Sequence, residues 1–350
     1  MATFDNFLTD ITQRYVVPNI VDTVLASNVL CLKLLGNPIP WRGTTYVQPI
    51  QTSASTAGGS FNPYDTFSTQ RQNLTNIMSF SPKAYYQSVT LSNLEIAVNK
   101  GQEGVINVIE SQMEMAKNSM ADGIGTIFYS DGTGNGGADF SGLKAAVDDG
   151  TVTATYGGLL RSTYTTIKAN RTASVGNLTL SGMGTMYNSC KVGTDRPDLI
   201  VTTETVWNYY ESLTQPTVVT NVDGYRQVTM DGSAQNRSAL KGEIGFDALF
   251  YRGAPIVADE KCSSGYMYFL NMNYLKWVSL PHPENTMVGS GSNVIEGVYS
   301  EAGHEVPVFS WTDWKRPTNQ DARTGQFILY GELINKNPNR SGVLLGITGV

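Results

Sequence analysis

Residues 101–137 read GQEGVINVIESQMEMAKNSMADGIGTIFYSDGTGNGG, which predicts one long helix followed by a glycine-rich loop. Apolar residues recur at the three- and four-residue steps that place them on one face of a helix. They are Val105, Ile109, Met113, Ala116, Met120, Ile124 and Ile127. We expect the helix to span residues 101–128, and at ~1.5 Å per residue it would be roughly 40 Å long. Such a rod is typical of a subunit that reaches its neighbours.

The segment before this helix is extended and poor in charge. Between residues 44 and 90 the charged residues are Asp65, Arg71 and Lys83. Residues 44–50 and 83–91 both look like strands, so they predict a long hairpin with a polar tip. A lone hairpin is at best marginally stable in water, so this one needs a partner, either its own body or another subunit. A disordered lid over an active site is the alternative.

The second half of the chain predicts a core of strands and helices. Apolar runs of strand length alternate with segments of helical period, bounded by glycine and proline. Together with the long helix and the extended segment, this pattern indicates the α+β fold class. The expected helices are 157–169, 180–190 and 204–213. The expected strands are 197–203, 265–271, 275–280, 325–333 and 342–348, and 249–258 is expected to form a strand, a turn and a strand.

Composition narrows the class of protein. Only 15% of the 350 residues are charged, against a typical ~25%, and we take this uncharged surface as weak evidence for assembly. The net charge is −6 and no run of Lys or Arg forms a basic stripe, so direct binding of nucleic acid is not indicated. The three cysteines lie far apart, which argues against a disulfide framework. The chain has no secretion signal at its start and no apolar stretch near the ~20 residues of a membrane span.

The search for chemistry ends without a catalytic, cofactor or metal site. The glycine loop 132–137 follows a helix, whereas a dinucleotide fingerprint follows a strand, so we expect a turn that ends the long helix. Asp148 with Asp149, and Glu301 with Glu305, are the paired carboxylates that glycoside hydrolysis would require, but surface acids are the simpler interpretation. No zinc motif surrounds His304. We therefore expect a structural protein and not an enzyme.

Three local patterns carry a family resemblance. DGTG at 131–134 with FSGL at 140–143 follows the long helix, and PDLIVTT at 197–203 is a strand leading into a helix. FYRGAPIVADE at 250–260 precedes GYMYFLNMNYL at 265–275. In this order they resemble the major capsid proteins of tailed bacteriophages, with the Hong Kong 97-type fold, over nearly the whole chain.

The resemblance implies a division of the chain into named parts. Each part of the family fold has a candidate here, and the A-domain boundaries are the least defined. The parts are an N-terminal arm at 1–43, an E-loop at 44–90, a P-domain at 91–174 with its spine helix at 101–128, an A-domain at 175–285, and strands at 286–350 that return to the P-domain.

The resemblance also implies a function. The chain would assemble as hexamers and pentamers into an icosahedral shell, made in the host cytoplasm, that encloses double-stranded DNA in the virion without reading its sequence. Its partners would be further copies of itself, with separate scaffolding, portal and decoration proteins as further candidates and no membrane. The inter-subunit contacts expected on the E-loop are Tyr64, Phe67, Arg71 and Tyr85.

Two departures from the family shape these expectations. The chain reaches its arm directly from Met1, so we expect a separate scaffolding protein or none. Lys83 is the only lysine of the E-loop and lies near the hairpin base, so we do not expect covalent crosslinks between subunits. The alternatives are another virion structural protein, such as a tail or fibre component, and a secreted carbohydrate-active enzyme.

Overall fold

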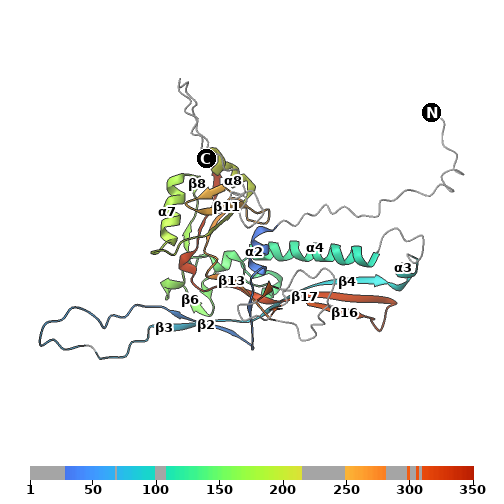
Figure 1. Ribbon diagram of the computed structural model, residues 1–350, viewed down its shortest axis with the longest axis horizontal. Coiled ribbons are helices and arrows are strands. Elements are labelled where there is room, and N and C mark those ends of the chain that lie inside the picture. The colour runs from blue at the N-terminus through green and yellow to red at the C-terminus, as the bar shows by residue number, and fades with distance from the viewer. Residues whose placement is uncertain are drawn as a thin grey trace, which may run out of the picture.

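The computed structural model describes residues 28–67, 69–98, 108–214, 249–280, 298–299, 305–306 and 310–350. Figure 1 shows a body built on two sheets, a long helix lying beside one of them, and a thin hairpin that projects far to one side. The predicted arm lies outside the described residues up to residue 27, as does the predicted first part of the long helix, residues 101–107.

The first sheet is organised around one long strand, β17 (Ala322–Asn335). β17 pairs with β4 (Lys83–Ser92) through residues 322–331, with β13 (Leu275–Ser279) through residues 331–335, and with β16 (Ser310–Lys315) through residues 324–328. All three pairings are antiparallel. A short parallel strand, β1 (Ile39–Pro40), lies beyond β13. Strands from distant parts of the sequence thus share one central strand.

The second sheet is buried on both faces. Within the described residues its order is β10 (Leu249–Tyr251), β11 (Ala254–Ala258), β9 (Leu199–Thr202), β12 (Met267–Leu270), β18 (Gly342–Leu344) and β7 (Asn170–Thr172). Successive residues of a strand point to opposite faces. In β9, Leu199 and Val201 join the large core cluster, whereas Ile200 joins a second cluster. Helices α7 (Leu180–Cys190) and α8 (Glu204–Thr214) supply the rest of that second cluster.

The long helix α4 (Val108–Phe128) packs one face against the first sheet. The buried residues Ala116, Met120, Ile124 and Phe128 are spaced by four, which confirms the predicted apolar face. Two glycines allow close neighbours. A Cβ at Gly123 would lie 2.2 Å from the Tyr85 hydroxyl of β4, and one at Gly125 would lie 1.9 Å from the Asn28 amide. Asn28 precedes α2 (Val29–Leu35) and donates to the Ala121 carbonyl at 3.2 Å.

The remaining described elements are short. They are α3 (Asn93–Val98), α5 (Gly134–Gly137), α6 (Leu143–Ala146), β5 (Thr155–Tyr156), β6 (Leu159–Leu160), β8 (Gly176–Asn177), β14 (Val298–Tyr299), β15 (Glu305–Val306), β19 (Ile347–Gly349), and 3₁₀ turns at Thr165–Ile167 and Pro338–Arg340. The glycine loop is a turn, as predicted, with Asn135, Gly136 and Gly137 at positive φ. All three cysteines are buried and unbonded. No helix in the described ranges has the length and hydropathy of a membrane span.

Two strand and helix predictions are corrected by the structure. The predicted helix 157–169 is wrong, because Gly157 and Gly158 have positive φ and form the turn between β5 and β6. The strand 44–50 does not pair with 83–91. It is β2 (Tyr46–Gln51) and pairs with β3 (Thr75–Phe80), a strand that the sequence pattern did not reveal. In the last segment, β16 and β17 lie in the first sheet, whereas β18 joins the second.

Candidate functional site: the projecting hairpin and its base

The projecting element is the hairpin formed by β2 and β3. The two strands pair from Tyr46↔Phe80 to Gln51↔Thr75, and residues 52–74 form the tip. Figure 1 shows this tip reaching well beyond both sheets. Its two sides are joined to each other and not to the body. Thr52 N donates to the Leu74 carbonyl at 2.9 Å.

A further pair of hydrogen bonds joins the two sides of the hairpin along the tip. Thr56 N donates to Gln72 Oε1 at 3.0 Å, and Gln72 Nε2 donates back to Thr56 Oγ1 at 2.9 Å. A short turn follows, in which Asn62 N donates to Asp65 Oδ2 at 2.7 Å. These bonds hold the shape of the tip, but the side chains that make them are exposed and build no core.

Three aromatic side chains of the tip are exposed. Phe61, Tyr64 and Phe67 have exposed fractions of 65%, 105% and 66%. Phe61 and Phe67 contact each other edge to face, with ring centroids 5.0 Å apart. Large aromatic rings that protrude together are typical anchors of protein interfaces, because they bury a large area at low entropic cost. We call Phe61, Tyr64 and Phe67 the aromatic tip.

The structure brings together three of the four contact residues expected from sequence. Tyr64, Phe67 and Arg71 all lie exposed on the tip. Tyr85 does not lie on the hairpin. It belongs to β4, it is half-buried against the large core cluster, and its hydroxyl lies at Gly123 of α4. Burial accordingly raises the pKa of the Tyr85 phenol. Sequence reasoning missed Phe61, although it has the same spacing from Tyr64 as Phe67.

The base of the hairpin is two-faced. Met78 and Phe80 are buried, whereas Val47 and Ile77 are about half exposed on the opposite face. The buried face rests on the turn between β5 and β6. Ser79 N donates to the Gly157 carbonyl at 2.9 Å, and the Phe80 ring meets the Tyr156 ring edge to face at 5.3 Å. We call Tyr156 and Gly157 the seat of the hairpin.

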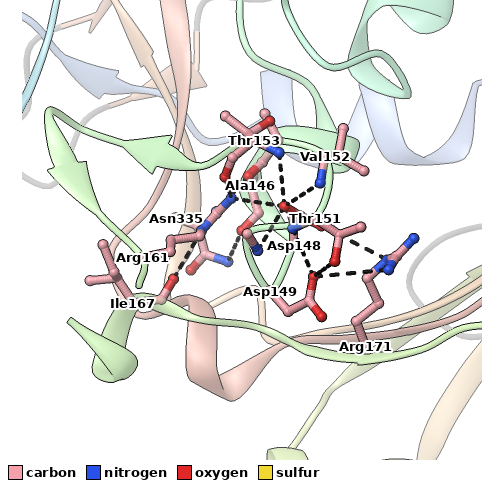
Figure 2. Close-up of polar contacts among 12 residues, drawn as sticks. Ala146, Asp148, Asp149, Thr151, Val152, Thr153, Arg161, Ile167, Arg171 and Asn335 are labelled. Atoms are coloured by element: carbon pink, nitrogen blue, oxygen red, sulfur yellow. Dashed lines mark hydrogen bonds and ion pairs between the residues drawn. The ribbon is translucent and has the colours of Figure 1, made fainter. Parts of the chain in front are cut away.

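A buried carboxylate organises the loop before the seat. Asp148 Oδ2 accepts backbone N–H bonds from Gly150 at 2.9 Å, from Val152 at 3.0 Å and from Thr153 at 2.9 Å. Figure 2 shows these amides converging on one oxygen atom. Arg161 Nη1 approaches the same oxygen at 3.4 Å, and both side chains are almost fully buried. A buried charge needs such a partner, because leaving it unpaired is costly.

Arg161 extends the same network to three carbonyl groups. It donates to Ala145 at 2.6 Å, to Thr153 at 2.9 Å and to Ile167 at 3.3 Å. Its guanidinium also lies over the Tyr156 ring, 4.9 Å from the centroid. Burial lowers the pKa of Arg161, and the charge of Asp148 opposes that effect. We call Asp148 and Arg161 the clamp.

The carboxylate pair considered for catalysis is thus committed to its own loop. Asp149 Oδ1 accepts from Thr151 N at 3.0 Å and from Thr151 Oγ1 at 2.6 Å. Burial raises the pKa of Asp149, but the bonds from Thr151 and the charge of Arg171 outweigh it, so the pKa is lowered overall. Glu301 and the side chain of Glu305 lie outside the described residues. Among the residues that the structure describes, no group of side chains could hold a metal ion.

Comparison with known proteins gives one kind of match. No protein-family model and no curated protein matches the chain. Among solved structures, the capsid of cyanophage A-1(L) matches with a TM-score of 0.70 at 15% identity, over 99% of this chain and 100% of that chain. The capsid of Myoviridae phage XM1 matches with a TM-score of 0.56 at 11% identity, over 99% of both chains.

The chain has the Hong Kong 97-type capsid fold. The fold prediction is therefore confirmed over the whole chain. An encapsulin, SrpI from Synechococcus elongatus, also matches this chain, with a TM-score of 0.56 at 11% identity, over 99% of this chain and 96% of that chain. The solved structures that share this fold are capsid and encapsulin shells. At these identities the likeness concerns the fold, and residue roles must come from this chain.

Proposed function

We propose that the chain is a major capsid protein, which self-assembles as hexamers and pentamers into an icosahedral shell around viral double-stranded DNA. The observation that carries this proposal is the projecting hairpin, on a chain whose capsid fold is complete. Its aromatic tip has no core of its own to pack in. A neighbouring copy of the chain would cover these rings, because an array of identical subunits offers every tip the same receiving surface.

The proposed parts of the subunit follow the described elements. The E-loop, residues 44–90, contains the hairpin, and the P-domain, 91–174, contains α4. The A-domain, 175–285, contains α7, α8 and most of the second sheet. Its strands β18 and β7, at one end of that sheet, come from flanking segments, so 286–350 contributes to both sheets. In the shell, A-domains would meet at the centre of each capsomer, and each E-loop would lie over a neighbour.

The charge of the chain fits a container for DNA and not a DNA-binding protein. A net charge of −6 offers no counterion release to a phosphate backbone. A shell that is filled by a separate motor does not need to neutralise its contents. In this proposal the subunit assembles in the host cytoplasm and ends in the virion, with separate scaffolding, portal and decoration proteins as further candidate partners.

Covalent crosslinking between subunits is not part of the proposal. Lys83 starts β4 and donates through Nζ to the carbonyl of Gly137, in the turn after α4. This lysine is thus held by its own subunit and not presented on the hairpin.

The encapsulin match supports a second candidate, a shell that encloses protein cargo. The two candidates share the fold and differ in contents. Purified particles from the native source distinguish them, because a capsid contains nuclease-protected double-stranded DNA and an encapsulin contains protein.

The first test is expression of the chain alone, followed by negative-stain electron microscopy of the soluble product. Closed shells, capsomer rings or curved sheets are the expected result. Tubes or isolated trimers would favour a tail or fibre component. Monomers that persist when the neighbouring open reading frames of the genome are co-expressed would overturn the shell proposal.

A further inference from the structure

The hairpin leaves its subunit through very few contacts. Within the described residues, β2 and β3 pair only with each other. The backbone bond from Ser79 to Gly157 and the contact of Phe80 with Tyr156 join the hairpin to the seat. Gly157 has φ +56, and a Cβ there would lie 2.7 Å from Met78 Cβ and 3.0 Å from Phe80 Cζ. The hairpin therefore lies directly on the backbone of the seat.

The seat cannot move freely, since the body holds it from two sides. The Tyr156 hydroxyl accepts from Asn335 N at 2.8 Å, which ties it to the end of β17. The Asn335 side chain donates at 3.3 Å to the carbonyl of Ala146, which ends α6 just before the loop that the clamp organises. On the other side of Tyr156 lies the guanidinium of Arg161. The hairpin is thus joined to the body by a series of contacts, in which Phe80 contacts Tyr156, and Tyr156 contacts both Arg161 and Asn335.

We infer that the seat and the clamp set the direction in which the hairpin leaves the subunit, and so determine where its tip meets the neighbour. The inference rests on the proposed function for its consequence in a shell, but the direction itself is a property of one subunit. Tyr156, Gly157, Asp148 and Arg161 are positioning residues in this scheme. None of them needs to touch another copy.

The length of the hairpin makes this direction important. From Tyr46 to Asn62 is sixteen residues, which reach at most ~50 Å at ~3.3 Å each. A tilt of about 4° at the base then moves the tip by roughly 3 Å over that reach. Such a shift is enough to misplace an aromatic anchor, because interface cores are packed as closely as protein interiors.

Two neighbouring glycines give a matched pair of variants. Gly157→Ala places a Cβ against Met78 at 2.7 Å, and relief to an ordinary 3.4 Å contact needs a movement of 0.7 Å (3.4 − 2.7). Gly158→Ala imposes the same kind of backbone strain, at φ +79, but its Cβ meets only Ser79 Oγ at 3.4 Å. Both variants thus carry the backbone strain, but only Gly157→Ala produces a clash with the hairpin.

The direction in which the hairpin leaves the subunit is followed by the distance between two spin labels, which pulsed electron paramagnetic resonance measures. One label goes on Gly58→Cys in the tip, where a Cβ meets nothing within 4 Å. The other goes on Ser181→Cys, exposed on α7. The native cysteines are buried, and burial raises the pKa of the Cys31 and Cys190 thiols to about 12, so they should stay unlabelled. Dilution into excess unlabelled protein removes distances between subunits.

Gly157→Ala should shift the mean distance by about 3 Å, whereas Gly158→Ala should leave it unchanged. Arg161→Lys, which keeps the charge but loses the forked bonds, should broaden the distance distribution, and Arg171→Lys should not. Identical distributions for the two glycine variants, or equal broadening for the two arginine variants, would overturn the inference. If Gly157→Ala does not fold, the comparison of Arg161→Lys with Arg171→Lys still tests the inference through the width of the distance distribution.

The same variants are then assembled, and shell diameters are measured by electron microscopy. Gly157→Ala should give altered or irregular particles, and Gly158→Ala should give particles of wild-type size. The two proposals fail separately in this design. A wild-type chain that forms no shell counts against the proposed function, whereas the label distances require no shell.

Discussion

The two ends of the hairpin differ in what surrounds them. At the base, Met78 and Phe80 are buried against a turn whose shape is fixed by a fully buried Arg161. At the tip, Phe61, Tyr64 and Phe67 are exposed, and the hydrogen bonds of the tip run only within it. The contacts within the subunit therefore fix where the hairpin starts, and in our proposal a neighbouring copy covers its end. Stability should depend on the base, and assembly on the tip.

The largest effect should come from breaking the clamp. Arg161→Ala leaves Asp148 buried with only the more distant Arg171 as a cation, and removing one partner of a buried pair typically costs about 3–5 kcal/mol. We expect the free energy of unfolding, measured with urea, to fall by that amount. Arg171→Ala is the control, because Arg171 is partly exposed and its nearest carboxylate oxygens are 3.9 Å away. Its loss should be below ~1 kcal/mol. Equal losses would show that the clamp has no special role at the base.

The next effect is a pH dependence located in the body and absent from the tip. Glu332 of β17 is buried and accepts a bond from Ser141 N at 2.6 Å. Burial raises its pKa to about 7, although the Ser141 bonds and the charge of Lys83 lower it. A raised pKa in the folded state gives stability that is complete below the unfolded pKa, near 4.5, and is lost as the pH rises through 7.

From the same shift, the free energy of unfolding should fall by up to about 3 kcal/mol between roughly pH 4.5 and pH 8. Urea titrations at several pH values measure it. Glu332→Gln should flatten the curve across that range. Tyr64→Ser, a change at the tip, should leave its shape intact, and a curve that Glu332→Gln does not alter would assign the dependence to another group.

Removal of the aromatic tip should separate assembly from stability. Replacing Phe61, Tyr64 and Phe67 with serine leaves the exposed surface of the subunit polar, so unfolding should change by less than ~0.5 kcal/mol. Loss of interface anchors worth about 2 kcal/mol would raise the concentration needed for assembly roughly 30-fold. Light scattering against concentration measures that threshold. Gln70→Ser, an exposed polar change in the same tip, should not move it. A shell that forms normally from the triple variant would refute the role of these rings.

The smallest effect should come from Tyr85. Its phenol lies against Gly123 in its own subunit, so Tyr85→Phe should change the free energy of unfolding by less than ~1 kcal/mol and leave the assembly threshold unchanged. A raised threshold with unchanged stability would return Tyr85 to the group of inter-subunit contacts.

The sequence was informative where the apolar pattern is long or continuous. Helix α4 buries one face, and its apolar residues recur with helical period. The central strands β9, β11 and β12 are apolar runs of strand length, because both faces of their sheet are buried, and the structure confirms them. It was misleading at 157–169, where Leu159, Leu160, Tyr164 and Ile167 have helical spacing. There Gly157 and Gly158 turn the chain, and the charged Arg161, which lies among these apolar residues in the sequence, is buried.

The hairpin shows a second limit of pattern reading. Strand β3 exposes Ile77 and buries Met78, so its apolar residues do not alternate, and the regular strand β4 was paired with β2 in its place. Two of the three tip aromatics, Tyr64 and Phe67, were expected as contacts because the family resemblance places the E-loop in this segment, and that role stays a prediction. The seat and the clamp could not be predicted, because most of their hydrogen bonds have a backbone N–H or carbonyl group as one partner, and every sequence possesses these groups.

The long strand β17 has a consequence for how the subunit opens. It bonds to β4, β13 and β16, which lie far apart in the chain. None of the three can separate from the body without exposing part of β17, so this sheet should exchange its amide hydrogens as one slow, cooperative unit. Apart from Ser79 N, which donates to the Gly157 carbonyl, the amides of β2 and β3 are protected only by the pairing of these two strands and should exchange early. In this molecule, the fastest-exchanging amides of the described strands would belong to the element that reaches furthest from the core.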